Sequence, residues 1–466
     1  MQNRRAFIQS MLSAPLVLAG AGAVGGLAAS RTMAANTADY RALVCVFLFG
    51  GMDCHDTVLP SSIPDYADYA AIRATLLDAY AALPGGSTRS LDALLPLGDL
   101  GQTGGVGGFA LPPQLGGLHD LYRSGRAAIV GNVGPLVEPT DRASFNSGAA
   151  RLPVRLFSHN DQQSTWMSFA PEGSQLGWGG LFGDAATRSG ANAQRIFSQI
   201  SLAGNAVFLT GQDVSPYQIS ANGVPSIRLI SAASSSLTPS LQQEMRDHFR
   251  AVGSLRDNLF EQDLIDLSRV SLDANDSLDR ALQGASGLDT VFPATALGGQ
   301  LRKVAETIDL RDTLGARRQV FFVALGGFDT HSAQANDLPA LQQDIGDSIA
   351  AFYTATEELG VADQVTTFTA ADFGRTLTVN GDGSDHGWGS HHFVVGGAVR
   401  GGEIYGDIPP PVLGHSQDAG NGRLIPTTSV EQFAAPLGRW YGLTQAELEM
   451  ALPGLANFTG PWPDFI

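Results

Sequence analysis

The chain has 466 residues, of which 44% are hydrophobic and 16% are charged, and its formal net charge is −17. This composition is that of a globular protein and excludes an intrinsically disordered one. A chain this acidic repels nucleic acids and anionic membrane surfaces, so we expect neither as a partner.

The N-terminal segment has the pattern of an export signal. Arg4-Arg5 precedes Phe7-Ile8, and an uncharged run rich in Gly and Ala follows from Met11 to Ser30. Paired arginines before a weakly hydrophobic run are typical of a twin-arginine signal peptide. We therefore expect residues 1–35 to engage the twin-arginine translocation machinery, to meet the membrane only transiently and to be removed, which predicts a periplasmic or secreted protein. The alternative is a permanent anchor, because the run reaches about 20 residues, the length of a membrane span.

Residues 36–466 are predicted to form one α/β domain. Continuous apolar runs predict buried strands, at 42–49, 127–130, 154–157, 226–230, 319–325, 364–369 and 393–395. Helical periodicity predicts helices, at about 65–82, 112–124, 238–285 (two helices), 297–314 and 337–359. The alternation favours a three-layer αβα sandwich around a mostly parallel sheet, with a helical insertion around 185–290.

Ionisable residues follow several of the predicted strands. Asp53, Asp329 with His331, and Asp372 each come after an apolar run, and Asp385-His386 comes shortly before one. Ligands of open α/β sheets bind beyond the carboxyl ends of the strands, and imidazole and carboxylate are common metal ligands. The sequence therefore predicts a metal site at that edge. The alternative for each Asp is a helix N-cap or an ion pair, as between Asp372 and Arg375.

Three of the nine histidines, His386, His391 and His392, fall within seven residues. His391 and His392 would point to opposite faces if they begin a strand, so at most one of them is expected to join His386. The two cysteines, Cys45 and Cys54, are too few for a zinc finger or a disulfide framework.

Several motifs, in this order, resemble the family catalogued as domain of unknown function 1501. They are the twin-arginine start, 49–53 (Phe-Gly-Gly-Met-Asp), 156–163 (Leu-Phe-Ser-His-Asn-Asp-Gln-Gln), 177–180 (Gly-Trp-Gly-Gly), 326–331 (Gly-Gly-Phe-Asp-Thr-His), 372–376 (Asp-Phe-Gly-Arg-Thr), 385–389 (Asp-His-Gly-Trp-Gly), 423–430 and 440–443. That family is similar to the alkaline phosphatase–sulfatase superfamily. The resemblance implies an alkaline phosphatase-like sandwich in which metal sites bracket a nucleophile.

The resemblance also implies the metal ligands. Asp53 would bind one metal, Asp329 and His331 the other, and His386 would be the late histidine ligand. Asp372 stands where the superfamily often has an Asp-His pair, but Phe373 replaces that histidine. The ion would be divalent: zinc, calcium, magnesium or manganese.

The nucleophile of the superfamily is a Ser, a Thr or a modified Cys near a helix N-terminus. Ser158, with His159 beside it, is our first candidate and Thr165 the second; the alternative for 158–161 is a capping turn. Arg375 could clamp a substrate oxygen or form a structural ion pair. Residues 54–58 (Cys-His-Asp-Thr-Val) lack the Pro and Arg of the formylglycine motif, so sulfatase chemistry of that kind is not expected.

Two functions follow from this interpretation. The first is an exported metal-dependent hydrolase that acts on an anionic small-molecule ester, a phosphate or a sulfate. The second is a non-catalytic exported binding or assembly protein with a degenerate metal site on the same fold.

Overall fold

The structure of the chain is a computed structural model that describes residues 39–84, 88–98, 108–224, 238–250, 257–284, 287–460 and 462–466. The described residues belong to one compact unit. The expected signal segment and the strand expected at 226–230 lie outside the described residues. No helix in the described part of the chain is long and apolar enough to span a membrane.

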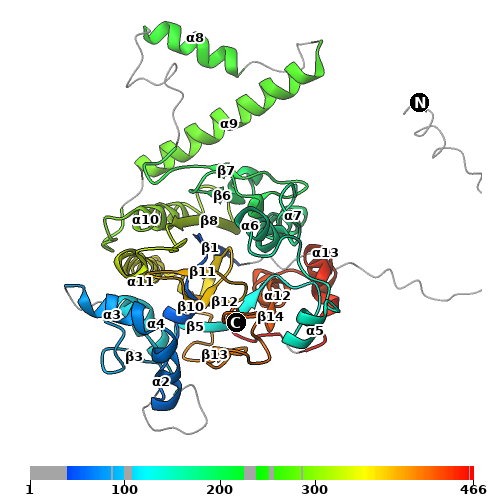
Figure 1. The fold of residues 1–466 in the computed structure, drawn as a ribbon. Helices are drawn as coiled ribbons and strands as arrows, with labels where there is room; N and C mark the ends of the chain where they lie inside the picture. Colours follow the sequence, from blue (N-terminus) through cyan, green and yellow to red (C-terminus); the bar gives the residue numbers. More distant parts are fainter. Residues whose placement is uncertain are drawn as a thin grey trace, which may run out of the picture. The chain divides into compact units, whose positions relative to one another are not determined.

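A nine-stranded sheet forms the centre of the fold (Figure 1). The strands along it are β13 (Ile404–Tyr405), β5 (Ala127–Gly134), β12 (Ser390–Gly396), β9 (Val365–Ala371), β1 (Arg41–Phe49), β8 (Arg318–Gly326), β6 (Gln199–Ser201) and β7 (Tyr217–Gln218), and β14 (Thr428–Ser429) pairs with β5. Strand β12 is antiparallel to both β9 and β5, whereas the other pairs in this sheet are parallel. The predicted α/β class with a mostly parallel sheet is confirmed.

Strand β1 shows why the sheet is buried on both faces. Its sequence is apolar from Ala42 to Phe49, and side chains alternate between the two faces of a strand. Ala42, Val44, Val46 and Leu48 belong to one hydrophobic cluster, and Leu43, Cys45 and Phe47 belong to another. Each face of the sheet therefore needs a layer of helices.

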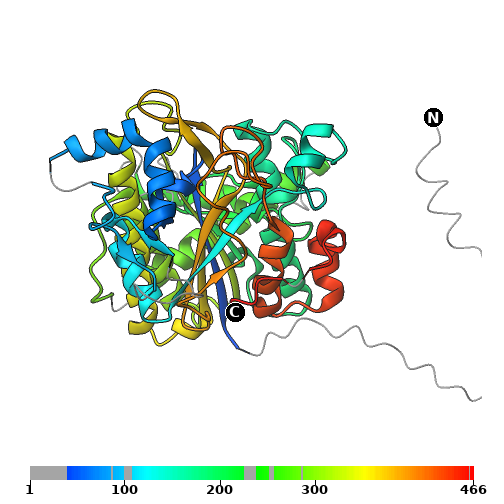
Figure 2. The ribbon, with the colours of Figure 1, turned by 60° about the horizontal axis from the view of Figure 1, so that its bottom comes forward.

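The two helical layers lie on opposite sides of the sheet (Figure 2). One layer contains α4 (Gly116–Arg123), α10 (Ala296–Asp309) and α11 (Gln334–Glu358); the other contains α6 (His159–Ser168), α7 (Trp178–Arg188), α12 (Val430–Tyr441) and α13 (Gln445–Ala451). The predicted three layers are thus present.

The remaining elements lie outside these layers and the central sheet. They are α2 (Ile63–Ile72), α3 (Ala74–Ala82), α5 (Arg142–Ser147), α8 (Pro239–Phe249), α9 (Leu259–Gln283), the pair β10 (Arg375–Val379) and β11 (Ser384–His386), and the three-stranded sheet of β2 (Leu59–Pro60), β4 (Phe109–Leu111) and β3 (Leu95–Pro96). The helix expected at 65–82 is two helices that meet at Arg73. Within the expected helical insertion, α8 and α9 are helices, but β6 and β7 extend the central sheet.

The strand predicted at 154–157 is wrong. These residues form turns, and Arg155 and Phe157 have φ angles of 51° and 71°. Residues in this left-handed region cannot continue an extended strand, so the apolar composition of the segment was misleading. The segment instead turns the chain into α6.

Candidate metal centre

The carboxyl ends of the parallel strands β1, β8 and β9 meet at one edge of the sheet. Asp372 follows β9 directly, and Asp53 and Asp329 lie in the turns after β1 and β8. The turn after β1 depends on glycine, because Gly50 has a φ of 113° and a Cβ there would lie 2.4 Å from the backbone nitrogen of Asp329. The glycine thus lets the turns after β1 and β8 approach each other closely.

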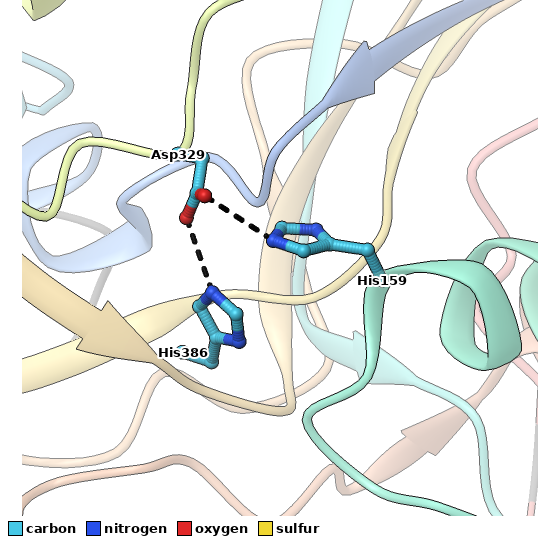
Figure 3. Close-up of side chains that lie close together, drawn as sticks. All are labelled: His159, Asp329 and His386. Atoms are coloured by element: carbon cyan, nitrogen blue, oxygen red, sulfur yellow. Dashed lines mark hydrogen bonds and ion pairs between the residues drawn. The ribbon is translucent and has the colours of Figure 1, made fainter.

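Three side chains from different elements converge at this edge (Figure 3). His159 is the first residue of α6, Asp329 lies in the loop after β8, and His386 is the last residue of β11. The Nε2 atom of His386 lies 3.1 Å from Oδ1 of Asp329, and Nε2 of His159 lies 3.4 Å from Oδ2. We call His159, Asp329 and His386 the trio.

The other ring nitrogen of each histidine is engaged by an oxygen that accepts hydrogen bonds. Nδ1 of His386 lies 2.8 Å from the carbonyl oxygen of Phe157. Nδ1 of His159 lies 2.7 Å from Oδ2 of Asp372, which is fully buried. Since a carbonyl or carboxylate oxygen accepts, each Nδ1 carries the hydrogen, and a neutral ring then presents a lone pair at Nε2.

The pKa shifts bear on which groups of the trio are charged. Burial lowers the pKa of His386, which keeps this ring neutral at pH 7. Burial opposes the ionisation of Asp329, but the hydrogen bond and charge of Arg375 lower its pKa below the ordinary value. The hydrogen bond to Asp372 raises the pKa of His159. Without a metal ion, a proton on His159 would therefore relieve the repulsion between lone pairs.

The spacing within the trio fits a metal ion. Two ligand atoms that are each about 2.0–2.1 Å from a tetrahedral zinc ion lie about 3.3 Å apart. The separations of 3.1 Å from His386 to Oδ1 and 3.4 Å from His159 to Oδ2 are close to this value, each for a different oxygen of Asp329, and one ligand atom from each of the three residues lies within 4.8 Å of the others. An acceptor oxygen behind each ligating histidine is also the usual outer shell of a metal site. The trio is therefore arranged so that it could hold one ion.

Asp329 is 44% exposed, and two further groups lie on this open side of the trio. Nε2 of His331 lies 2.8 Å from Nε2 of His386 and 3.1 Å from Oδ1 of Asp329. Its Nδ1 lies 3.3 Å from Oδ1 of Asp385. The predicted residues Asp329, His331 and His386 thus lie together, and solvent reaches them.

Asp372 lies behind His159, away from the open side. Its Oδ2 accepts hydrogen bonds from Gln163 at 2.8 Å and from the backbone of Gly50 at 3.2 Å, besides the one from His159. Its Oδ1 is buried and has no hydrogen-bond partner among the described residues. This placement favours a role in orienting His159 over the expected role as a direct ligand.

The side chain of Arg375 also points into the protein interior and away from the open side of the trio. Its side chain is fully buried, donates to Oδ1 of Asp329 at 2.7 Å and also bonds the carbonyl of Ser384. This is the structural ion pair that we considered as the alternative to a substrate clamp, made with Asp329 and not with Asp372.

Asp53 is not brought to the trio. Arg73 donates to both of its carboxylate oxygens, at 2.7 and 3.1 Å, and Gln334 donates to Oδ2 at 2.7 Å. Both side chains of this ion pair are fully buried. Burial opposes the ionisation of Asp53, but Arg73 lowers its pKa below the ordinary value. The surroundings favour a structural role for Asp53 over that of a ligand.

The candidate nucleophiles are engaged within α6. The hydroxyl of Ser158 donates to Oδ2 of Asp161 at 2.9 Å, and that of Thr165 donates to the carbonyl of Asp161 at 2.7 Å. Ser158 is the N-cap residue of α6, as in the alternative interpretation of 158–161 as a capping turn. Cys54 is buried, and burial raises the pKa of its thiol to about 12.

His391 and His392 are buried in β12 and stand outside the trio. Burial lowers the pKa of both rings to about 3, so they stay neutral at pH 7. Nδ1 of His391 accepts a hydrogen bond from the backbone of Asn132 at 2.9 Å. Of the three clustered histidines, only His386 joins the trio.

Sequence reasoning missed what three groups contribute to this site, although it singled out Phe373 as the replacement of a histidine. They are the carbonyl of Phe157, the amide of Gln163, and the ring of Phe373, whose centroid lies 4.9 Å from that of His159 and 4.6 Å from that of His386. The motif at 156–163 includes Phe157 and Gln163, so the sequence does indicate that this segment is functionally important. A backbone carbonyl leaves no mark in the sequence, so its role needed the structure.

Residues 241–451 match the model of DUF1501, a protein family of unknown function. The match includes Asp329, Asp372 and His386 but not His159. No curated protein matches the chain.

Solved structures resemble the chain at low sequence identity. Ps i-CgsB, in complex with k-i-k-neocarrahexaose, is 9% identical, with a TM-score of 0.34 over 90% of this chain and 77% of that one. The PsFucS1 sulfatase from Pseudoalteromonas sp. is 11% identical, with a TM-score of 0.34 over 88% of this chain and 68% of that one. Likeness at this level does not reveal a substrate.

Proposed function

We propose that the chain is a metal-dependent hydrolase of phosphate or sulfate esters, with His159, Asp329 and His386 as ligands of one divalent ion. The observation that carries this proposal is the convergence of the trio, in which two Nε2 lone pairs and a carboxylate face one another at 3.1 and 3.4 Å. Like partial charges held this close are costly unless a cation or a proton lies among them.

The donor set narrows the choice of ion. Two imidazole nitrogens and one carboxylate suit zinc, and manganese is the next choice, whereas calcium and magnesium prefer sites built from oxygen alone. A bound ion would act as a Lewis acid toward an ester oxygen and lower the pKa of a water molecule.

The residues around the trio have separate roles in this proposal. Asp372 and the carbonyl of Phe157 hold the hydrogens of His159 and His386 at Nδ1 and fix the orientation of both rings. Arg375 holds Asp329 ionised. His331 lies on the open side, where its Nε2 donates to Nε2 of His386 in the metal-free chain. With an ion held by His386, the hydrogen of His331 would sit on Nδ1, 3.3 Å from Oδ1 of Asp385, and Nε2 would be free to take a proton from the attacking water.

Water is the proposed nucleophile, in place of Ser158. The hydroxyl of Ser158 already donates to Asp161, which is a neighbour on its own helix. A serine nucleophile needs a base that accepts its proton and an open path to the substrate. Asp161 is an acceptor, but burial by its helix neighbours leaves it only 2% exposed.

The alternative function is a non-catalytic exported protein that binds metal. Phe373 favours it, because this apolar ring packs against both histidines of the trio where the superfamily often has a further histidine. Metal binding without hydrolysis would support this alternative.

Metal analysis and an ester assay test the proposal together. Purified wild-type chain is expected to carry about one zinc or manganese ion and to hydrolyse an aryl phosphate or sulfate. His386→Gln should lose both properties. His248→Gln is the matched control, because His248 is an exposed residue of α8. A wild-type chain that neither retains nor takes up a stoichiometric divalent ion would contradict the proposal.

Export is a separate part of the proposal. It rests on the paired arginines at 4–5 and the apolar run that follows them. Replacement of both arginines by lysine should block delivery to the periplasm by the twin-arginine machinery, measured by cell fractionation. Unchanged delivery of the double variant would point to another export route.

A further inference from the structure

A small cavity lies beside α12, and it is lined almost entirely by apolar residues. Its volume is about 110 Å³. The lining includes Leu136, Leu152, Thr165, Phe169 and Glu431, together with three prolines. The single charged residue in this lining is Glu431.

Glu431 is buried at this cavity and lacks a basic partner. It lies in the first turn of α12 and is only 4% exposed. No lysine, arginine or histidine forms an ion pair with it among the described residues. Hydrogen bonds from its own backbone N–H and from the hydroxyl of Ser429 offset part of the cost of burying this carboxylate, but the cost of burial is larger, and no positive charge of the described residues faces it.

The carboxylate occupies a space that the backbone leaves open for it. A Cβ on Gly454 would lie only 2.2 Å from Oε1 of Glu431, so a side chain at that position would displace the carboxylate. The N-terminal end of α12 also favours a negative charge at Glu431. Gly454 thus leaves room for the carboxylate, and the helix end offsets part of the cost of its ionisation.

The cavity wall is poor in hydrogen-bond donors. Three of its residues are proline, which has no backbone N–H. Thr165 cannot serve as the donor, because its hydroxyl already donates to the carbonyl of Asp161 at 2.7 Å. A ligand for this cavity must therefore bring both a positive charge and its own donors.

We propose that this cavity binds the ammonium group of a small primary amine, held by the carboxylate of Glu431. An ammonium group supplies three donors and one positive charge. A short alkyl chain would lie against Leu136, Leu152 and Phe169. The volume suits a molecule of a few heavy atoms, since a single water needs about 10–15 Å³ of such space.

Protonation of Glu431 competes with amine binding. Burial raises the pKa of Glu431 to about 7, so its carboxylate is ionised at pH 8 and protonated at pH 5.5. Charged groups on the neighbouring elements are engaged elsewhere: Asp161 with Ser158 and Arg155, and Glu138 with Arg151. The ammonium ion should therefore bind at pH 8 and not at pH 5.5.

Calorimetric titration of the full chain with propylammonium chloride tests the proposal. We expect saturable binding at pH 8, weakened at least about tenfold by Glu431→Gln and by a shift to pH 5.5. Propanol, which has the same size without the charge, should not bind. Glu244→Gln is the matched control, because it removes one charge from the exposed face of α8 and should leave binding unchanged.

Two outcomes would overturn the proposal. One is the absence of saturable binding by the wild-type chain at pH 8, and the other is equal binding by Glu431→Gln. If Glu431→Gln does not fold, Leu152→Phe provides a second test, because it narrows the cavity and keeps the carboxylate. Undiminished binding by Leu152→Phe would place the amine elsewhere.

Discussion

Asp53 and Asp329 follow neighbouring parallel strands through the same four-residue motif, Gly-Gly-x-Asp, yet their surroundings differ. Strands β1 and β8 pair with Phe49 level with Gly326, so the motif after β8 begins one residue earlier relative to the sheet than the motif after β1. Asp53 is 1% exposed and lies in the interior, whereas Asp329 is 44% exposed and lies at the rim. Both Asp residues lie beyond the strand ends, so the turns at Gly50, Gly51 and Gly327, which have positive φ angles, direct the two side chains to different places.

The arginine that each carboxylate meets decides what remains available for a ligand. Each oxygen of Asp53 accepts one hydrogen bond from Arg73 and a second one from Gln334 or the backbone of His55, which leaves no lone pair directed at a metal. Arg375 binds only Oδ1 of Asp329, and Oδ2 faces His159. A carboxylate that follows a strand is therefore a candidate ligand only where its arginine partner leaves one of the two oxygens unbound.

The largest expected effect is on folding stability, at Asp53. Asp53→Asn should lower the free energy of unfolding by about 3–5 kcal/mol, because it leaves the buried guanidinium of Arg73 without a countercharge. Urea denaturation followed by circular dichroism measures it. A loss below about 1 kcal/mol would contradict this prediction, because an exposed ion pair contributes that much to the free energy of unfolding.

Glu431 is a buried carboxylate like Asp53, but no arginine among the described residues forms an ion pair with it. Burial raises its pKa from 4.5 to about 7, so the folded chain holds a proton that the unfolded chain has released between these pH values. Stability should therefore fall as the pH rises through this window. Glu431→Gln should remove the fall and be more stable than wild type by up to roughly 3 kcal/mol at pH 8 without amine.

Thermal unfolding of both proteins at pH 4 and pH 8 tests this prediction. The two melting temperatures should be close at pH 4, where Glu431 is protonated in both the folded and the unfolded chain. A variant that is less stable than wild type at pH 8 would mean that the carboxylate is compensated within the protein.

Asp372→Asn tests the role of Asp372, which accepts the hydrogen bond from Nδ1 of His159. Asparagine can still accept the hydrogen bond from Nδ1 of His159 but lacks the charge that makes Nε2 a stronger ligand. We expect about 10- to 100-fold weaker metal binding, measured by competition with a chromogenic chelator. Asp161→Asn, on the same helix as His159 but outside the trio, should change the affinity much less.

The smallest expected effect on stability is at Asp329. Asp329→Asn keeps an oxygen for Arg375 but removes the countercharge of its buried guanidinium, so the metal-free chain should lose about 1–2 kcal/mol, less than at Asp53 because Asp329 is 44% exposed. The same variant should fail to retain metal. The same change from Asp to Asn should thus mainly destabilise the fold at Asp53 and mainly abolish metal binding at Asp329. These two results together would establish the difference between the two motifs.

Sequence patterns located the strands and helices that carry the site, because apolar runs and helical periodicity are local signals. They also singled out Asp329, His331, His386 and His159, which the structure places together. They could not separate Asp53 from Asp329, because Arg73 reaches Asp53 from between α2 and α3, and nothing in that helical stretch marks it as a partner. Nor did they find the turn at 154–157, where left-handed residues replace a strand.

Strand β12 runs against its neighbours, and this direction has a consequence for the rate of folding. Because β12 is antiparallel to β9, the residues that precede β12 reach the edge of the sheet where Asp329 lies, and His386 is one of them. His386 also contacts the carbonyl oxygen of Phe157, from which it is separated by 229 residues in the sequence. Contacts between residues this far apart in sequence raise the contact order of a fold, and folds of high contact order form slowly. Metal uptake during refolding, which needs His386 in place, should therefore be slow, and time-resolved measurement of that uptake tests this.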